Sequence, residues 1–111
     1  MRILLDECLP RRLQGSLASH DCRCVPAAGW AGVKNGELLA LAENAGFQVL
    51  LMIDRGIEYQ QNLAAGRISV VLIRSPSNRL ADLQPLVPEI LRVLVSLEPG
   101  QLVKVGPGTN S

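Results

Sequence analysis

Aromatic residues are scarce in this 111-residue chain, which contains one Trp, one Tyr and one Phe. Leu, Val, Ile and Ala must therefore fill most of its core. The chain also lacks a large excess of either charge, because it has 11 Lys and Arg and 10 Asp and Glu. A net charge of +1 excludes a general electrostatic attraction to nucleic acid or membranes, so any such attraction must come from a local patch.

Cysteine is present only as Cys8, Cys22 and Cys24, an odd number, and the first residues do not form a signal peptide. These two features argue against a secreted domain held together by disulfides. The apolar runs are too short to cross a membrane. We therefore predict a soluble cytoplasmic protein with reduced thiols and no membrane partner.

Short apolar runs alternate with segments of helical periodicity. The expected strands are Arg2–Leu5, Cys22–Val25, residues 47–54, Ile68–Ile73 and Leu102–Val105. The expected helices are residues 9–20, Glu37–Ala45, Glu58–Ala65 and Leu80–Leu97, the last starting late because of Pro85 and Pro88. This pattern predicts one α/β domain over residues 1–105 with a mostly parallel sheet, right-handed crossovers and a disordered tail over residues 106–111.

Acidic residues stand where the predicted strands end. Asp6 and Glu7 follow the first strand, Asp54 closes the third, and Glu37 lies in the first turn of a helix. The carboxyl ends of parallel strands meet at one edge of the sheet, so these acids should converge. Converging carboxylates repel unless a cation lies among them, and their oxygens suit Mg²⁺ or Mn²⁺. Taken singly, the same residues would be turn formers, caps or complements of a helix dipole.

The chain then resembles a known family. The segments ILLDECLPRRL, GWAGVKNGELLALAENAGFQVLLMIDRGIEYQQNL and ISVVLIRSPSNRLADLQPLVPEIL are similar to those of bacterial PIN-like proteins, which are relatives of the PIN-domain ribonuclease toxins. The resemblance covers residues 1–105. It implies a PIN-like three-layer α/β/α sandwich and a metal-dependent endoribonuclease. It further implies an RNA substrate, Mg²⁺ or Mn²⁺, a homodimer and a cognate antitoxin of a toxin–antitoxin pair.

The resemblance also implies roles for particular residues. Asp6, Glu37 and Asp54 match the family's catalytic, metal-binding acids, and Glu7 matches a further acidic position. The chain departs from the pattern at Gly56, where the family often has a second acid, and at Ile53, where it often has Thr or Ser. A one-metal or inactive site therefore stays open, as does replacement of the missing acid by Asn78 or Glu58.

Four arginines should lie near the same edge and could hold the RNA backbone: Arg11, Arg12, Arg55 and Arg79. Each of them could equally be an ordinary solvated side chain.

Two other functions compete with the nuclease. A PIN-like module could bind RNA or an antitoxin without cutting. A phosphoacceptor receiver domain would use Asp54 as the phosphorylated residue, with Ser75 and Lys104 beside it. Receiver domains, however, have Pro after that Lys, where Val105 stands here, and leave Glu37 without a role.

Three further groups of residues invite a function. His20, Cys22 and Cys24 have a weak zinc-like spacing, although buried thiols packing as small apolar groups explain them better. Trp30 lies in a Gly-flanked loop and is expected to pack over the sheet edge or to contact a partner or an RNA base. The polar residues 59–62 could face a base or phosphate, or water.

Overall fold

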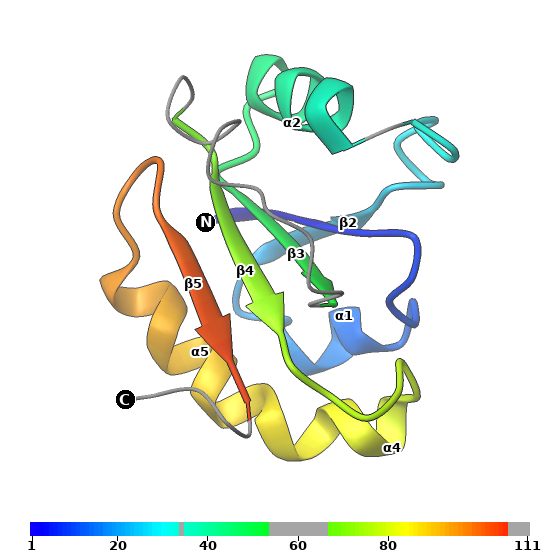
Figure 1. Ribbon diagram of the computed structural model, residues 1–111, viewed down its shortest axis with the longest axis vertical. Coiled ribbons are helices and arrows are strands. Elements are labelled where there is room, and N and C mark those ends of the chain that lie inside the picture. The colour runs from blue at the N-terminus through cyan, green and yellow to red at the C-terminus, as the bar shows by residue number, and fades with distance from the viewer. Residues whose placement is uncertain (34, 54–66, 107–111) are drawn as a thin grey trace.

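The computed structural model describes residues 1–33, 35–53 and 67–106. Within these ranges five strands form one sheet in the order β2-β1-β3-β4-β5, and every neighbouring pair is parallel (Figure 1). The strands are β1 (Arg2–Leu5), β2 (Asp21–Cys24), β3 (Val49–Ile53), β4 (Ser69–Ile73) and β5 (Leu102–Val105). The prediction of an α/β domain with a mostly parallel sheet is confirmed. The predicted helix over Glu58–Ala65 lies outside the described residues.

The helices differ more from the predictions than the strands do. They are α1 (Leu13–Ser16), α2 (Asn35–Asn44), α4 (Leu80–Leu83), the 3₁₀ turn η1 (Gln84–Leu86) and α5 (Val87–Ser96). The prediction of one helix over residues 9–20 is wrong, because only a single turn forms there. Gly15 lies inside that turn and disfavours the helical conformation.

The long helix predicted over Leu80–Leu97 is broken rather than delayed. Helical structure begins at Leu80 but tightens to a 3₁₀ turn at Pro85, and α5 carries Pro88 in its first turn. Proline lacks an N–H and crowds the preceding turn, which explains the break. No helix in the described ranges is long and apolar enough to cross a membrane.

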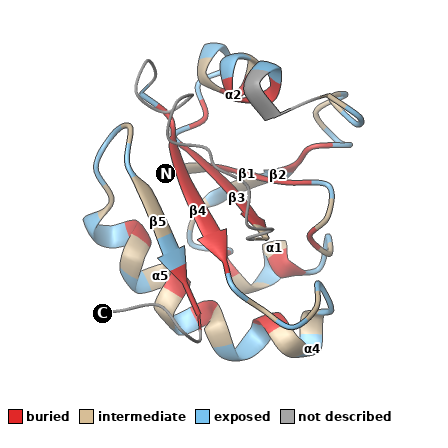
Figure 2. Cartoon of the chain, in the orientation of Figure 1, coloured by how far each residue is buried: buried red, intermediate tan, exposed pale blue. Residues whose placement is uncertain are grey.

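Two apolar layers sandwich the sheet. On one face the strand residues Ile3, Leu5 and Val71 pack with α1, α4 and α5, and on the other Leu4 and Leu50 pack with α2. The alternation follows from the period of two in a strand. Burying both faces explains why β3 is apolar throughout and β4 is apolar except for Ser69 (Figure 2). Leu38 and Ala42 of α2 are buried as predicted, but Leu39 is buried where Leu41 was expected.

One crossover contradicts the expectation of uniform handedness. The steps from β1 to β2 and from β4 to β5 run in opposite directions across the sheet, yet α1 and the α4–α5 segment cover the same face. Two crossovers that run in opposite directions over the same face have opposite hands. The β2–β3 crossover runs opposite to the β1–β2 crossover but over the other face, through α2, so these two share one hand. The β4–β5 connection is therefore the exception to the right-handed rule. Its physical role is to cover β3–β5 on a face where α1 supplies only one turn.

Candidate functional site

The switch point of the sheet lies between β1 and β3. The chain passes from β1 to β2 on one side and continues through β3, β4 and β5 on the other. In open parallel sheets, ligands bind in the crevice at the carboxyl ends of the strands at such a point. Asp6 is the residue that follows β1, and Asp54 is the residue that follows β3 in the sequence. Asp54 itself lies outside the described residues.

Asp6 is held firmly at this edge. Its backbone N–H donates a hydrogen bond to the Leu51 carbonyl at 2.9 Å, which extends the pairing of β1 with β3 by one residue. Its side chain is only 8% exposed, and the Cys8 thiol donates to its Oδ2 atom at 2.9 Å. Within the described residues, the carboxylate accepts only this one weak hydrogen bond from another side chain. Its other lone pairs can therefore bind a ligand.

The other predicted acids are more exposed. The Glu7 carboxylate accepts long hydrogen bonds from the Gly32 N–H, at 3.3 and 3.4 Å, which ties the turn after β1 to the loop after β2. Glu37 lies in the first turn of α2 and is exposed. Among residues 1–33, 35–53 and 67–106, no three His, Cys, Asp or Glu side chains gather closely enough to hold a metal ion. The predicted set requires Asp54, which lies outside these ranges.

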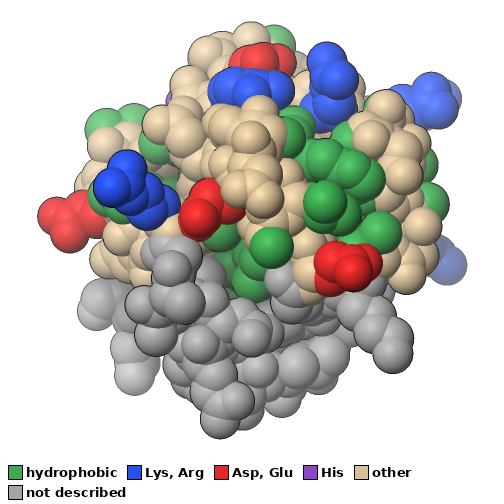
Figure 3. Space-filling model, turned by 90° about the horizontal axis from the view of Figure 1, so that it is seen from above, with side chains coloured by type: hydrophobic (Ala, Val, Ile, Leu, Met, Phe, Trp, Pro, Cys, Tyr) green, Lys and Arg blue, Asp and Glu red, His purple; other side chains and the backbone are tan. Residues whose placement is uncertain are grey.

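The three predicted RNA-binding arginines in the described ranges come from two segments. Arg11 and Arg12 are exposed just before α1, and Arg79 is exposed at the start of α4. Arg55 lies outside the described residues. Figure 3 shows the molecule from the α2 side, where basic and acidic side chains are interspersed among the coloured residues.

Asn78 is one of the two residues that could replace the missing acid, and the structure gives it a different contact. Its side-chain N–H₂ donates to the Cys8 carbonyl at 2.8 Å, across 70 residues of sequence. This bond brings the loop after β4 to the turn that holds Asp6. Only a turn-rich SPSN stretch marked Asn78 in the sequence, and nothing local pointed to its partner. Glu58, the other substitute, lies outside the described residues.

A hollow lies at the carboxyl edge of the sheet, with Glu7 in its wall, and we call it the carboxyl-edge hollow. Its volume is about 530 Å³, and its lining residues are Glu7, Leu9, Arg11, Gln14, Cys24, Pro26 and Ala27. These residues come from the turn after β1, from α1, and from the end of β2 and its following loop. The sequence does not reveal the hollow, because it forms only when these segments meet.

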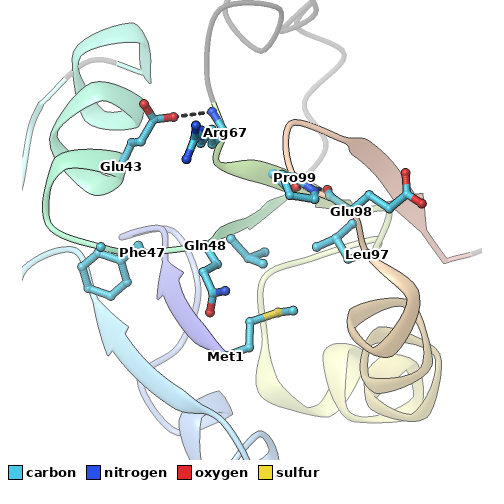
Figure 4. A pocket seen from close by; sticks show the side chains of 11 residues that line it. Met1, Glu43, Phe47, Gln48, Arg67, Leu97, Glu98 and Pro99 are labelled. Carbon is cyan, nitrogen blue, oxygen red and sulfur yellow. Dashed lines mark hydrogen bonds between the residues drawn. The ribbon is translucent and has the colours of Figure 1, made fainter.

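A second hollow, the amino-edge hollow, lies at the opposite ends of the strands and measures about 370 Å³. Figure 4 shows Glu43 pointing to Arg67 across it, with Met1 and Gln48 below and Leu97 and Pro99 on the far wall. The Glu43 carboxylate accepts from the backbone N–H groups of Arg67 and Ile68. This hollow is distant from the predicted acids, and its polar groups already fasten the chain.

Most of the remaining candidates have structural contacts, whereas the buried Nδ1 atom of His20 has no hydrogen-bond partner within the described ranges. The Cys24 sulfur accepts a hydrogen bond from the Gln14 amide at 2.9 Å, and the Cys22 thiol donates to the Leu17 carbonyl at 3.7 Å. Burial raises the pKa of Cys22 to about 11, with a smaller contribution from the Asp21 charge, which keeps the thiol neutral. Trp30 is half-buried and meets Phe47 edge-on, with ring centroids 6.1 Å apart. Residues 59–62 lie outside the described ranges.

No protein-family model, no curated protein and no solved structure matches this chain. The resemblance to PIN-like proteins therefore stays a prediction.

Proposed function

We propose that this protein is a metal-dependent endoribonuclease of the PIN-like type. The observation that carries the proposal is the buried Asp6 carboxylate at the switch point between β1 and β3, with Asp54 next in sequence after β3. Two acids that follow adjacent parallel strands at a ligand-binding edge suit phosphodiester chemistry. The motif resemblance points to the same class. Under this proposal the five-stranded domain is a PIN-like three-layer sandwich.

The donor set fits a hard divalent cation. Asp6 and Asp54 would hold Mg²⁺ or Mn²⁺, with Glu37 as a further oxygen donor. Glu7, also expected at the metal from the sequence, is left out of this set because its carboxylate accepts from the Gly32 N–H in the loop after β2. The metal would supply an activated water and charge neutralisation at the phosphate. Cys8 keeps the Asp6 carboxylate oriented through its thiol, and the Asn78 amide keeps Cys8 in place. Exposed Arg11, Arg12 and Arg79, together with Arg55, bind RNA phosphates.

The biological role that follows is that of a toxin. The protein acts in the cytoplasm as a homodimer, and a cognate antitoxin protein blocks the acidic edge. Gly56 and Ile53 support the alternative of a PIN-like module that binds RNA or the antitoxin without cutting, because both positions depart from the family pattern.

Three structural observations bear on the receiver-domain alternative. The strand order 2-1-3-4-5 is the order of doubly wound receivers, but strand order alone does not assign function. The helices between β4 and β5 lie on the α1 face, whereas uniformly right-handed winding would place them on the α2 face. In addition, the Ser75 hydroxyl already donates to the Ser77 carbonyl at 2.7 Å. The nuclease proposal is therefore preferred.

The test is cleavage of a mixed RNA pool with Mg²⁺ or Mn²⁺ by the wild type and by Asp6→Asn. We expect EDTA to stop cleavage and Asp6→Asn to slow it by about 100-fold or more, because removing one metal-stabilising group typically costs this much. Asp21→Asn is the matched control, since Asp21 is exposed at the amino edge and its carboxylate pairs only with Arg2 within the described ranges.

Equal cleavage by wild type and Asp6→Asn would refute the proposed site. Absence of cleavage in all samples, with RNA still bound, would favour the non-cutting module. Phosphorylation of Asp54 by acetyl phosphate, lost in Asp54→Asn, would favour the receiver domain.

A further inference from the structure

The carboxyl-edge hollow has a position that relates it to the proposed nuclease site. Glu7 in its wall is the residue after Asp6, and Glu7 also joins the loop after β2 through Gly32. A nucleotide whose phosphate lay at Asp6 would lie beside Glu7, a wall residue of this hollow. The inference below rests on the proposed function for that placement.

The inner wall of the hollow is apolar. Leu9 and Cys24 are buried members of the core, and Pro26 and Ala27 form the side supplied by the loop after β2. The volume of about 530 Å³ lies within the range of about 300–1,000 Å³ for pockets that bind small organic ligands. Apolar walls suit an uncharged flat ring, such as a base, better than they suit a free phosphate.

The polar groups of the hollow determine which hydrogen-bonding groups a bound ring must have. The Glu7 carboxylate has two parallel acceptor oxygens, and its contacts with the Gly32 N–H are long, at 3.3 and 3.4 Å. The Gln14 amide nitrogen is engaged by Cys24, which leaves its carbonyl oxygen as the group for a ligand. Acceptors therefore dominate the inside, and exposed Arg11 supplies positive charge at the wall.

We propose that the carboxyl-edge hollow binds one base of single-stranded RNA and prefers guanine. The guanine ring presents two adjacent N–H donors, N1–H and the exocyclic amine, which match the two oxygens of a carboxylate. Arg11 binds the adjoining phosphate. No aromatic side chain of the described residues lines the hollow, so the recognition proposed here depends on the edge of the base rather than on stacking.

The test measures binding of the four 5′-nucleoside monophosphates to the metal-free protein by calorimetry, so that no metal-bridged contact contributes. We expect GMP to bind about tenfold more tightly than UMP or CMP, a ratio typical of one matched bidentate contact. Glu7→Gln should remove the preference, because an amide offers only one acceptor. Ala27→Trp should block all four nucleotides by filling the hollow.

Ala18→Trp is the matched control, because Ala18 is also exposed but does not line the hollow. It should bind GMP as the wild type does, and circular dichroism of both Trp variants would verify that they fold. Equal affinity for the four nucleotides, or unchanged GMP binding by Ala27→Trp, would overturn the proposal.

The same variants distinguish failure of the proposed base site from failure of the proposed nuclease site. If Asp6→Asn loses RNA cleavage while Ala27→Trp cuts the same RNA positions at the wild-type rate, the nuclease stands and the base site is refuted. If GMP binds selectively in wild type and Asp6→Asn but no Asp6-dependent cleavage occurs, the base site stands and the nuclease is refuted.

Discussion

The two edges of the sheet carry similar polar residues but use them differently. At the amino edge, side chains bind backbone groups of distant segments: Ser69 donates to the Glu98 carbonyl at 2.5 Å, and Glu43 accepts from Arg67 and Ile68. Arg2 donates to the Ala45 carbonyl at 2.6 Å. These groups fasten the loops between strands and helices, so their hydrogen-bonding capacity is spent on the fold.

At the carboxyl edge the contacts are weaker or more local. Asp6 accepts a hydrogen bond from the thiol of Cys8, two residues away, and Glu7 accepts a long hydrogen bond from the Gly32 N–H. The Asn78 bond to Cys8 is the exception, since it spans the sheet. The comparison shows that residue type alone does not separate a structural acid from a candidate ligand. The two kinds of acid differ in whether their carboxylates already accept strong hydrogen bonds from backbone N–H groups.

The largest expected effect contrasts one glycine at each edge. At Gly106 φ is +118°, and a Cβ there would lie 2.3 Å from the Arg74 carbonyl oxygen. Arg74 follows β4, and its N–H is hydrogen-bonded to the Val105 carbonyl at the end of β5. We expect Gly106→Ala to lower the free energy of unfolding by about 2–5 kcal/mol, the sum of left-handed strain and overpacking.

Gly46→Ala at the amino edge should cost less. Its Cβ would meet only the end of the Arg2 side chain, which can move, so backbone strain of about 1–2 kcal/mol remains. Urea denaturation of both variants measures the difference. Equal losses would show that the Arg74 contact relaxes as easily as the Arg2 side chain does.

The next effect tests the structural character of the amino edge. Ser69 is 1% exposed, and its hydroxyl also accepts from the Gln101 N–H at 3.1 Å. Ser69→Ala should cost about 1–3 kcal/mol of stability, because it leaves buried backbone groups unsatisfied. Exposed Ser96→Ala is the control and should change stability by less than about 0.5 kcal/mol. RNA cleavage by both variants should match the wild type at temperatures where they are folded.

A smaller effect, of the opposite kind, is expected at the carboxyl edge. Asp6→Asn removes a negative charge that is buried and has no described cationic partner. Its stability should therefore equal or exceed that of the wild type, by at most about 1 kcal/mol, because a buried charge without a partner opposes folding. A loss of more than this in thermal unfolding would assign Asp6 to the fold and would weaken the contrast between the edges.

The smallest effect concerns pH. Because the pKa of Cys22 is raised to about 11 from its ordinary value of 9.0, the folded state keeps the thiol proton after the unfolded chain has lost it. Stability should therefore fall as pH rises from about 9 towards 11. Cys22→Ala should lack this part of the decline when urea midpoints are compared at pH 8 and 10.5. An identical decline in both proteins would show that other groups cause it.

The sequence predicted the strands well because each is a short apolar run that must be buried. β4 is apolar except for Ser69 and is buried throughout. The helices were predicted less well, since Gly15 and Pro85 interrupt periodic patterns that otherwise continue. At the candidate site, Asp6 was placed correctly at the end of β1. Its thiol donor and the Asn78 contact were missed, because hydrogen bonds between particular side chains leave no periodic signal.

By itself, the sequence determined which segments are strands, that they alternate with helices, and that an acid follows β1. Local apolar pattern suffices for these features, because burial depends on the period of the residues along the chain. Only the tertiary structure decided that the β4–β5 connection crosses on the α1 face and that segments far apart in sequence form the carboxyl-edge hollow. The physical reason is that local periodicity specifies an apolar face but not the surface it packs against.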